Sequence, residues 1–303
     1  MLKSKINSRR VSLGFLQLLP LLLLNSALAG DLTLEQARAG VDKGDAQSQY
    51  FLGKCYFKGQ GMPQDYAKAA DLFRHAADQG YALAQNNLGV IYARGLGVTK
   101  DDAVAAKWYG KAAEQGDALA QNNLGRFYAT GRGVPQDWKL AISWYRKAAE
   151  QNLPAAQYTL GDLYFRGEGV PQDYVQAANW TRKAAEQGDP LAQNTLGVMC
   201  ELGLGVQANP SEGLKWFRQA AAQGNPRGEM NLGRMYKEGS VIEQDYAKAY
   251  EWLTISKNSG EVEAAKLLVE LDYSGKLTTN QIIEARRVAA ELLAKKPSVK
   301  TTP

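Results

Sequence analysis

The side chains best suited to catalysis are few in this chain and far apart in sequence. His75 is the one histidine, and Cys55 and Cys200 are the two cysteines. No Cys/His cluster has the spacing of a metal site, and no G-x-S-x-G or S-x-x-K sequence would supply an activated serine. We therefore expect no metal and no cofactor, and no covalent catalysis of a familiar kind.

Two carboxylates remain as candidates for acid/base chemistry. Asp162 and Glu201 could together perform the general acid and general base steps of a glycosidase-like hydrolase, but nothing in the sequence sets their separation. The recurrent Gly-x-Gly-Val turns lack the lysine and the preceding strand of a phosphate-binding loop. The sequence predicts a protein that is not an enzyme, with a cell-wall-directed, β-lactamase-like hydrolase or a carbohydrate-binding protein as the alternative.

The dominant feature of the chain is an internal repeat. The fragment GYALAQNNLG at Gly80 returns as GDALAQNNLG at Gly116 and as GDPLAQNTLG at Gly188. Every step in this register is a multiple of 36 residues, without insertions. A constant period of this length is typical of solenoids, in which stacked units form one extended surface.

One repeat predicts two helices. Residues 45–58 carry apolar or small side chains at one-helix-face spacing, and Gly59 ends this helix. Asp65 begins the second helix as its N-cap, and that helix continues to Gly80. The equivalents of this N-cap are Asp101, Asp137, Asp173, Asn209 and Asp245.

Three rows of residues recur at this period. One row is leucine, and beside it runs a row of glycines, which predicts close helix contact because glycine inside a helix costs about 1 kcal/mol. The third is tryptophan, which we interpret as core between helices rather than as an aromatic binding strip. The rows are Leu52, Leu88, Leu124, Leu160, Leu196 and Leu232; Gly53, Gly89, Gly125, Gly161, Gly197 and Gly233; and Trp108, Trp144, Trp180, Trp216 and Trp252.

The N-terminus resembles an export signal. Four cations precede an apolar run from Val11 to Leu24, and Ala27-Leu28-Ala29 supplies a cleavage site. We expect residues 1–29 to be removed, which places the protein in the periplasm or outside the cell with no stable membrane insertion. An uncleaved anchor is the alternative. Without these four cations the net charge falls from +5 to +1, which gives no case for nucleic-acid binding.

The remaining segments and the two thiols complete the predicted organisation. Residues 30–43 form an N-terminal capping helix, 44–260 the six repeats, 261–296 capping helices, and 297–303 a disordered tail. Cys55 and Cys200 lie four repeats apart, roughly 40 Å at one helix-packing distance per repeat, which is too far for a disulfide. Both are expected to be buried, and His75 to be exposed.

The string ALAQNNLGVIYARGLGVTKDDAVAAKWYGKAAEQG resembles the Sel-1-like repeat family, relatives of tetratricopeptide repeats. The likeness extends from Asp45 to Gly260. It implies an all-α, right-handed superhelical solenoid of helix-turn-helix repeats that serves as an interaction scaffold or adaptor and has no shared catalytic residues. The chain departs from the pattern at Cys200, at Gly213 and at Gly239-Ser240-Val241. It also lacks the repeated cysteines of the family's β-lactamase-labelled members.

The resemblance also indicates where a partner would bind. In tetratricopeptide repeats the first helix of each unit lines a concave face, which here places positions 47, 50, 54, 57 and 58 of the first repeat on that face. The chemistry of these positions changes between repeats, as expected for a groove that binds another protein or an extended peptide segment to a monomeric scaffold. The candidate residues are Tyr50, Lys54, Phe57, Asn86, Arg94, Asn122, Arg126, Tyr158, Asp162, Phe165, Arg166 and Asn194.

Overall fold

A computed structural model describes residues 32–295, and this part of the chain contains fifteen helices and no strand. The leading and closing segments, residues 1–29 and 297–303 of the predicted organisation, lie outside it. The first helices of the six repeats are α2 (Ala46–Lys58), α4 (Ala82–Arg94), α6 (Ala118–Thr130), α8 (Pro154–Arg166), α10 (Pro190–Leu202) and α12 (Pro226–Glu238). The second helices are α3 (Tyr66–Asp78), α5 (Asp102–Glu114), α7 (Trp138–Glu150), α9 (Tyr174–Glu186), α11 (Pro210–Ala222) and α13 (Tyr246–Asn258).

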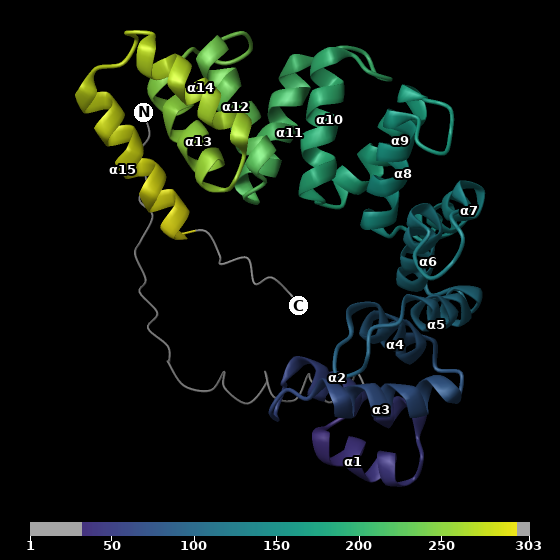
Figure 1. The fold of residues 1–303 in the computed structure, drawn as a ribbon. Helices are drawn as coiled ribbons and strands as arrows, with labels where there is room; N and C mark the ends of the chain where they lie inside the picture. The colour runs from purple at the N-terminus through teal and green to yellow at the C-terminus, as the bar shows by residue number, and fades with distance from the viewer. Residues whose placement is uncertain (1–31, 296–303) are drawn as a thin grey trace, which may run out of the picture.

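Three further helices cover the ends of this stack: α1 (Leu34–Asp42) at the beginning, and α14 (Val262–Tyr273) and α15 (Thr279–Lys295) at the end. Each helix packs mainly on its neighbours in the chain, so the repeats follow one another along an arch around an open centre (Figure 1). The predicted all-α solenoid with a 36-residue period is confirmed. No helix in the described part is long and apolar enough to cross a membrane.

Helix ends follow the sequence signals. The side chain of Asp65 accepts a hydrogen bond from the backbone N–H of Lys68 at 3.0 Å, and each of its five equivalents caps its own helix in the same way. Gly59 ends α2 in the left-handed conformation, with φ of 68°, where glycine carries no steric penalty. These two signals set the thirteen-residue length of both helices.

The glycine row allows close packing of the two helices in each repeat. A Cβ atom at Gly89 would lie 2.7 Å from ring atoms of Tyr109, and one at Gly197 would lie 2.6 Å from Phe217. The predicted close contact is thereby confirmed. The large buried side chains opposite the glycines form the centre of the repeats, and we call them the core row: Phe73, Tyr109, Tyr145, Thr181, Phe217 and Leu253.

The tryptophan row lies one position before the core row and is half-buried. Trp108 packs against the cluster built by α3 and α4, and the later tryptophans pack in the same way on the repeat before them. A lysine amine lies over the ring of Trp108, Trp144 and Trp180 at 4.0 to 4.2 Å. Each tryptophan therefore packs in the core with one side of its ring only, and the residue that follows it, a member of the core row, is the buried one.

A chain of glutamines joins neighbouring repeats, and sequence reasoning missed it. Gln85 lies buried and donates to the backbone carbonyl of Ala77, while its own oxygen accepts from Gln115 at 2.7 Å. The same donor and acceptor pattern recurs at Gln121, Gln157 and Gln193. These hydrogen bonds satisfy both ends of each buried amide and fix the register of one repeat on the next.

The second glycine of each Gly-x-Gly turn also contacts the repeat before it. A Cβ atom at Gly205 would lie 1.9 Å from the backbone oxygen of Tyr174, and one at Gly133 would lie 2.1 Å from that of Asp102. Both glycines have positive φ values, of 70° and 65°. The turns after α4, α6, α8 and α10 therefore rest on the start of the preceding second helix.

The two ends of the solenoid differ. Thr33 and Gln36 form the predicted capping box of α1, and Leu34 of this helix lies beside the turn at Gly61, where a preceding repeat would otherwise be. At the other end, α14 matches a seventh first helix but has Val269 where the six repeats have glycine. The side chain of Val269 blocks close approach, and α15 instead packs on α13.

Candidate binding surface on the first helices

The candidate surface is the face of the first helices that turns toward the open centre of the arch. Figure 1 shows this relation clearly at α6, which faces the centre, whereas α7 lies behind it. We define the inner stripe as positions 47, 50, 54 and 58 of the first repeat and their equivalents at 36-residue steps. Because these positions are three or four residues apart, they share one face of each helix.

The predicted aromatic residues are half-buried and pack within the solenoid. The ring of Tyr50 lies 5.1 Å from that of Tyr81 and 5.8 Å from that of Phe73. Phe57 makes an edge contact with Tyr66, and Phe165 repeats this contact with Tyr174, both at 5.3 Å. Tyr158 packs on the cluster of α9 and α10. These rings contribute edges to the surface rather than free anchors.

The predicted asparagines connect adjacent first helices. Asn86 is buried and accepts a hydrogen bond from Asn123 at 3.2 Å, and Asn194 is buried and accepts one from Asn231 at 2.9 Å. Asn122 is half-buried, and its side-chain oxygen has no hydrogen-bond partner among the described residues. Asn86 and Asn194 thus have a structural role between repeats, which leaves less of them for a partner than the sequence predicts.

The charged candidates divide the inner stripe into two halves. Lys54 is half-buried, Arg94 and Arg126 are exposed, and none of the three has an ion-pair partner among the described residues. In the second half, by contrast, Arg166 lies 3.0 Å from the carboxylate of Asp162. Further along, Arg234 pairs with both Glu201 and Glu238 at 2.6 and 3.1 Å.

The carboxylates proposed for acid/base chemistry are therefore engaged elsewhere. Asp162 is paired with Arg166 on α8, and Glu201 with Arg234 on the next first helix. No group of three or more His, Cys, Asp or Glu in residues 32–295 could hold a metal ion.

Exposed leucines at the start of the first helices were missed by sequence reasoning. Leu83, Leu119 and Leu191 are 42%, 51% and 50% exposed, and they occupy the position of Gln47 in the second, third and fifth repeats. Position 47 belongs to the expected concave face, so the leucines at its equivalent positions in later repeats could have been found from the sequence. These leucines are therefore added to the candidate residues of this surface.

The family of the chain follows from a comparison of its repeats with models of known protein families. A model of the Sel1 repeat matches residues 46–81, 82–117, 118–153, 154–189, 190–225 and 226–261. The chain belongs to the Sel1 repeat family. The matched units run without gaps and together span well over half of the sequence.

Solved structures of Sel1 proteins have the same architecture. One is a protective antigen present in uropathogenic Escherichia coli strains, with 39% identity and a TM-score of 0.75 over 86% of this chain. This chain covers 57% of that antigen, so it spans little more than half of its length. Another is a Sel1 repeat protein from Oxalobacter formigenes, with 33% identity and a TM-score of 0.67, matched over 75% of this chain and 100% of its own. No curated protein matches this Sel1 chain.

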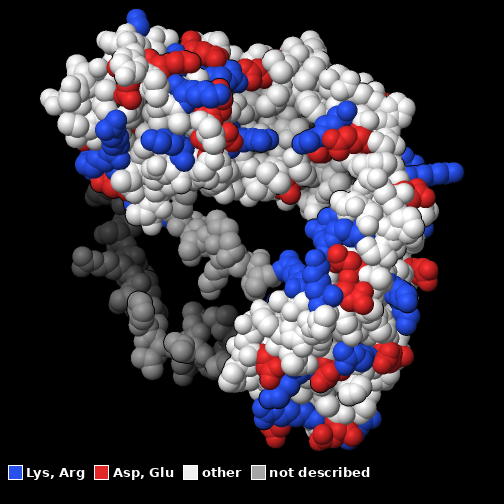
Figure 2. Space-filling model, in the orientation of Figure 1, with Lys and Arg blue, Asp and Glu red and all other residues white. Residues whose placement is uncertain are grey.

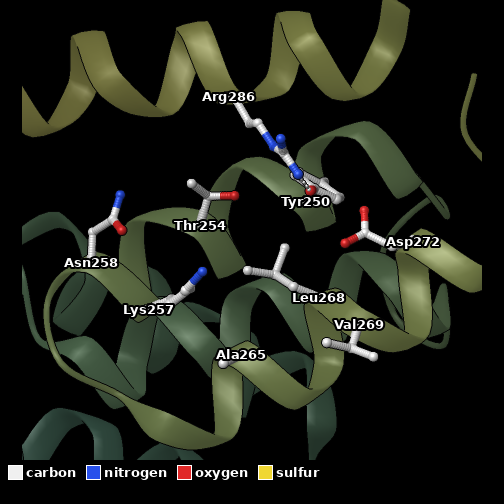
Figure 3. A pocket seen from close by; sticks show the side chains of 9 residues that line it. All are labelled: Tyr250, Thr254, Lys257, Asn258, Ala265, Leu268, Val269, Asp272 and Arg286. Carbon is white, nitrogen blue, oxygen red and sulfur yellow. Dashed lines mark hydrogen bonds between the residues drawn. The ribbon is translucent and has the colours of Figure 1, made fainter. Parts of the chain in front are cut away.

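A hollow lies between α13, α14 and α15, where α15 leaves the regular packing (Figure 3). It has a volume of about 490 Å³, with Leu268 and Val269 among its apolar walls. At one end Arg286 donates two hydrogen bonds to the hydroxyl of Tyr250, at 3.2 and 2.7 Å, and Asp272 lies beside them. Burial is the main cause that raises the pKa of Tyr250. This arrangement holds the closing helix on the stack.

Both thiols are expected to be unreactive in the folded Sel1 protein. Cys55 and Cys200 are free and buried, and burial raises the pKa of Cys200 to about 11. At pH 8 the thiolate fraction of Cys200 would be about one in a thousand, and the thiolate is the reactive form. Ellman's reagent should label neither cysteine in the native protein and both in denaturant. Rapid native labelling of Cys200 would contradict its burial, and a missing thiol in denaturant would indicate a disulfide.

Proposed function

We propose that this Sel1 protein is a non-catalytic scaffold of the periplasm or the extracellular space that binds another protein through the inner stripe. Support for binding comes from the exposed leucines and unpaired cations on one concave, repeated surface. Support for the compartment comes from the sequence of residues 1–29 alone. The observation that carries the proposal is the row of Leu83, Leu119 and Leu191, because two successive first helices, α4 and α6, and one later one, α10, leave about half of a large apolar side chain exposed at the same position.

Site-specific photo-crosslinking in cells tests this function. A photoreactive amino acid at Leu119 reports on the inner stripe, and the same residue at Lys107, which is exposed on second helix α5, is the matched outer control. We expect a crosslinked partner protein from position 119 and none from position 107. Crosslinking only from position 107 would move the binding surface to the outer face and overturn the proposal.

The alternative function, a cell-wall hydrolase, is tested with the same purified protein. Turnover of nitrocefin or peptidoglycan that survives changes in the inner stripe would contradict a purely binding role. Cell fractionation tests the compartment, because a protein that retains residues 1–29 in the cytoplasm would contradict export. The engaged state of Asp162 and Glu201 favours the scaffold, since both carboxylates already neutralise arginines.

A further inference from the structure

We propose that the first half of the inner stripe, on α2, α4 and α6, binds an acidic segment of a partner protein that also carries apolar side chains. This inference rests on the proposed function and specifies the chemistry of its partner. Two groups of side chains on the same surface support this inference. Unpaired cations lie along one edge of the surface, and exposed leucines lie along the other.

The cations are unpaired only in this half of the stripe. Lys54, Lys58, Arg94 and Arg126 have no ion-pair partner among residues 32–295, whereas the stripe arginines of α8 and α12 are neutralised by carboxylates of the first helices. The fold therefore pairs the stripe arginines with carboxylates in one half and leaves the four cations of the other half without an ion pair. An acidic partner would supply the missing charge.

Two of the unpaired cations lie on neighbouring first helices. The side chain of Asn123 on α6 donates a hydrogen bond to that of Asn86 on α4 at 3.2 Å, so the stripes that carry Arg94 and Arg126 run side by side. Burial raises the pKa of Tyr109 to about 12, and Arg126 and Arg94 are the first of the charges that oppose this rise. Figure 2 shows Lys and Arg atoms on the wall of the central opening, with Asp and Glu atoms beside them. Two neighbouring guanidinium groups suit carboxylates that follow one another along an extended chain.

The leucines lie at the opposite ends of the same helices. Leu83 begins the stripe of α4 that ends at Arg94, and Leu119 begins the stripe of α6 that continues to Arg126. Two acidic residues at the start of first helices are engaged as caps: Asp45 of α2 and Asp117 of α6 accept hydrogen bonds from the backbone N–H groups of Ser48 and Ala120 at 2.7 and 2.6 Å. The repeats of α4 and α6 thus each offer one exposed leucine and one exposed arginine, and α2 adds the cations Lys54 and Lys58.

This pairing favours a protein segment over other polyanions. Exposed leucines contribute nothing to binding a phosphate backbone, which is held by cations and polar groups. A bilayer is flat or convex at this scale, whereas helix α6, which carries Arg126, faces the open centre of an arch (Figure 1). A peptide that carries both carboxylates and apolar side chains matches both edges and fits within the curve.

Fluorescence anisotropy with the full chain tests the inference. The probe is a labelled peptide with glutamates and leucines separated by serine and glycine. Its controls are the same peptide with lysine for glutamate and with serine for leucine. We expect the first peptide to bind best and to lose affinity as salt increases. Equal or better binding of the lysine peptide would overturn the inference, as would preferred binding to an oligonucleotide or to anionic phosphatidylglycerol vesicles.

A matched pair of variants locates the contact. R94E combined with R126E should lower the affinity for the acidic peptide at least about tenfold, which corresponds to about 1.4 kcal/mol of binding free energy. K107E combined with K215E makes the same charge change at exposed sites on second helices and should have little effect. All four side chains are exposed, so the fold should tolerate both variants, and circular dichroism checks this. If both pairs lower the affinity equally, the change in net charge alone explains the effect, and the inference is overturned.

The two proposals fail in different ways. Should the crosslink from position 119 persist in the R94E/R126E protein, the scaffold function stands and the acidic partner is wrong. Loss of that crosslink in R94E/R126E but not in K107E/K215E supports both. Absence of any crosslink from position 119 in the unmodified background removes the function itself.

Discussion

Replacing Gly205 by alanine is expected to lower the free energy of unfolding by about 3 kcal/mol or more. Two costs combine at this site. The left-handed conformation, with φ of 70°, is strained for any residue with a Cβ atom. That atom would also lie 1.9 Å from the backbone oxygen of Tyr174, so the turn must leave the preceding second helix. Urea denaturation followed by circular dichroism measures the loss.

Gly188 provides the control, because it isolates the first of these costs. Its φ is 90°, but a Cβ atom there would meet nothing within 4 Å. Alanine at Gly188 should therefore cost only about 1 kcal/mol, from backbone strain alone. Hydrogen exchange should show the G205A effect at the joint between α9 and α10. If G205A and G188A lower the free energy of unfolding by the same amount, the contact between the turn at Gly205 and the preceding repeat does not contribute to stability.

Replacing Phe217 by alanine is expected to cost about 3–5 kcal/mol. This ring is fully buried and packs directly on Gly197, with Leu232 and Met235 in the same cluster. Removing it leaves a cavity that the two helices cannot close, because Gly197 has no side chain to fill the space. Chemical denaturation measures the change in the free energy of unfolding.

Thr181 is the natural control for this core position. It occupies the same place in the fourth repeat, and its buried hydroxyl has no hydrogen-bond partner among the described residues. T181A removes a small side chain together with an unsatisfied polar group, so it should change stability by about 1 kcal/mol or less. A loss at T181A as large as that at F217A would show that ring packing does not dominate the core row.

Much of the fold was predictable because its signals are local and are repeated six times. Asp65 and its equivalents fixed the helix starts, Gly59 and its equivalents the ends, and the glycine row the close contacts. The core row was harder to find. Trp108 and its equivalents were the most conspicuous aromatics, yet the adjacent position is the fully buried one, and its residues vary from tyrosine to threonine.

The candidate surface was predictable in position but not in chemistry. The helical spacing of the first helices places Arg94 and Arg126 on one exposed face, and both side chains are exposed in the structure. The burial of Asn86 depends on a hydrogen bond to Asn123 of the next repeat, and the pairing of Arg234 depends on Glu201 of the previous one. Contacts of this kind join different units, and periodicity within one unit carries no information about them.

The glutamine chain has a consequence for how such a molecule can change its length. Since Gln85, Gln121, Gln157 and Gln193 make the same two hydrogen bonds, the junctions they form are interchangeable. A whole unit can thus be gained or lost by duplication or deletion of its coding segment without designing a new junction. The reach of the molecule changes in discrete increments, while the side chains offered to a ligand are free to differ in every increment.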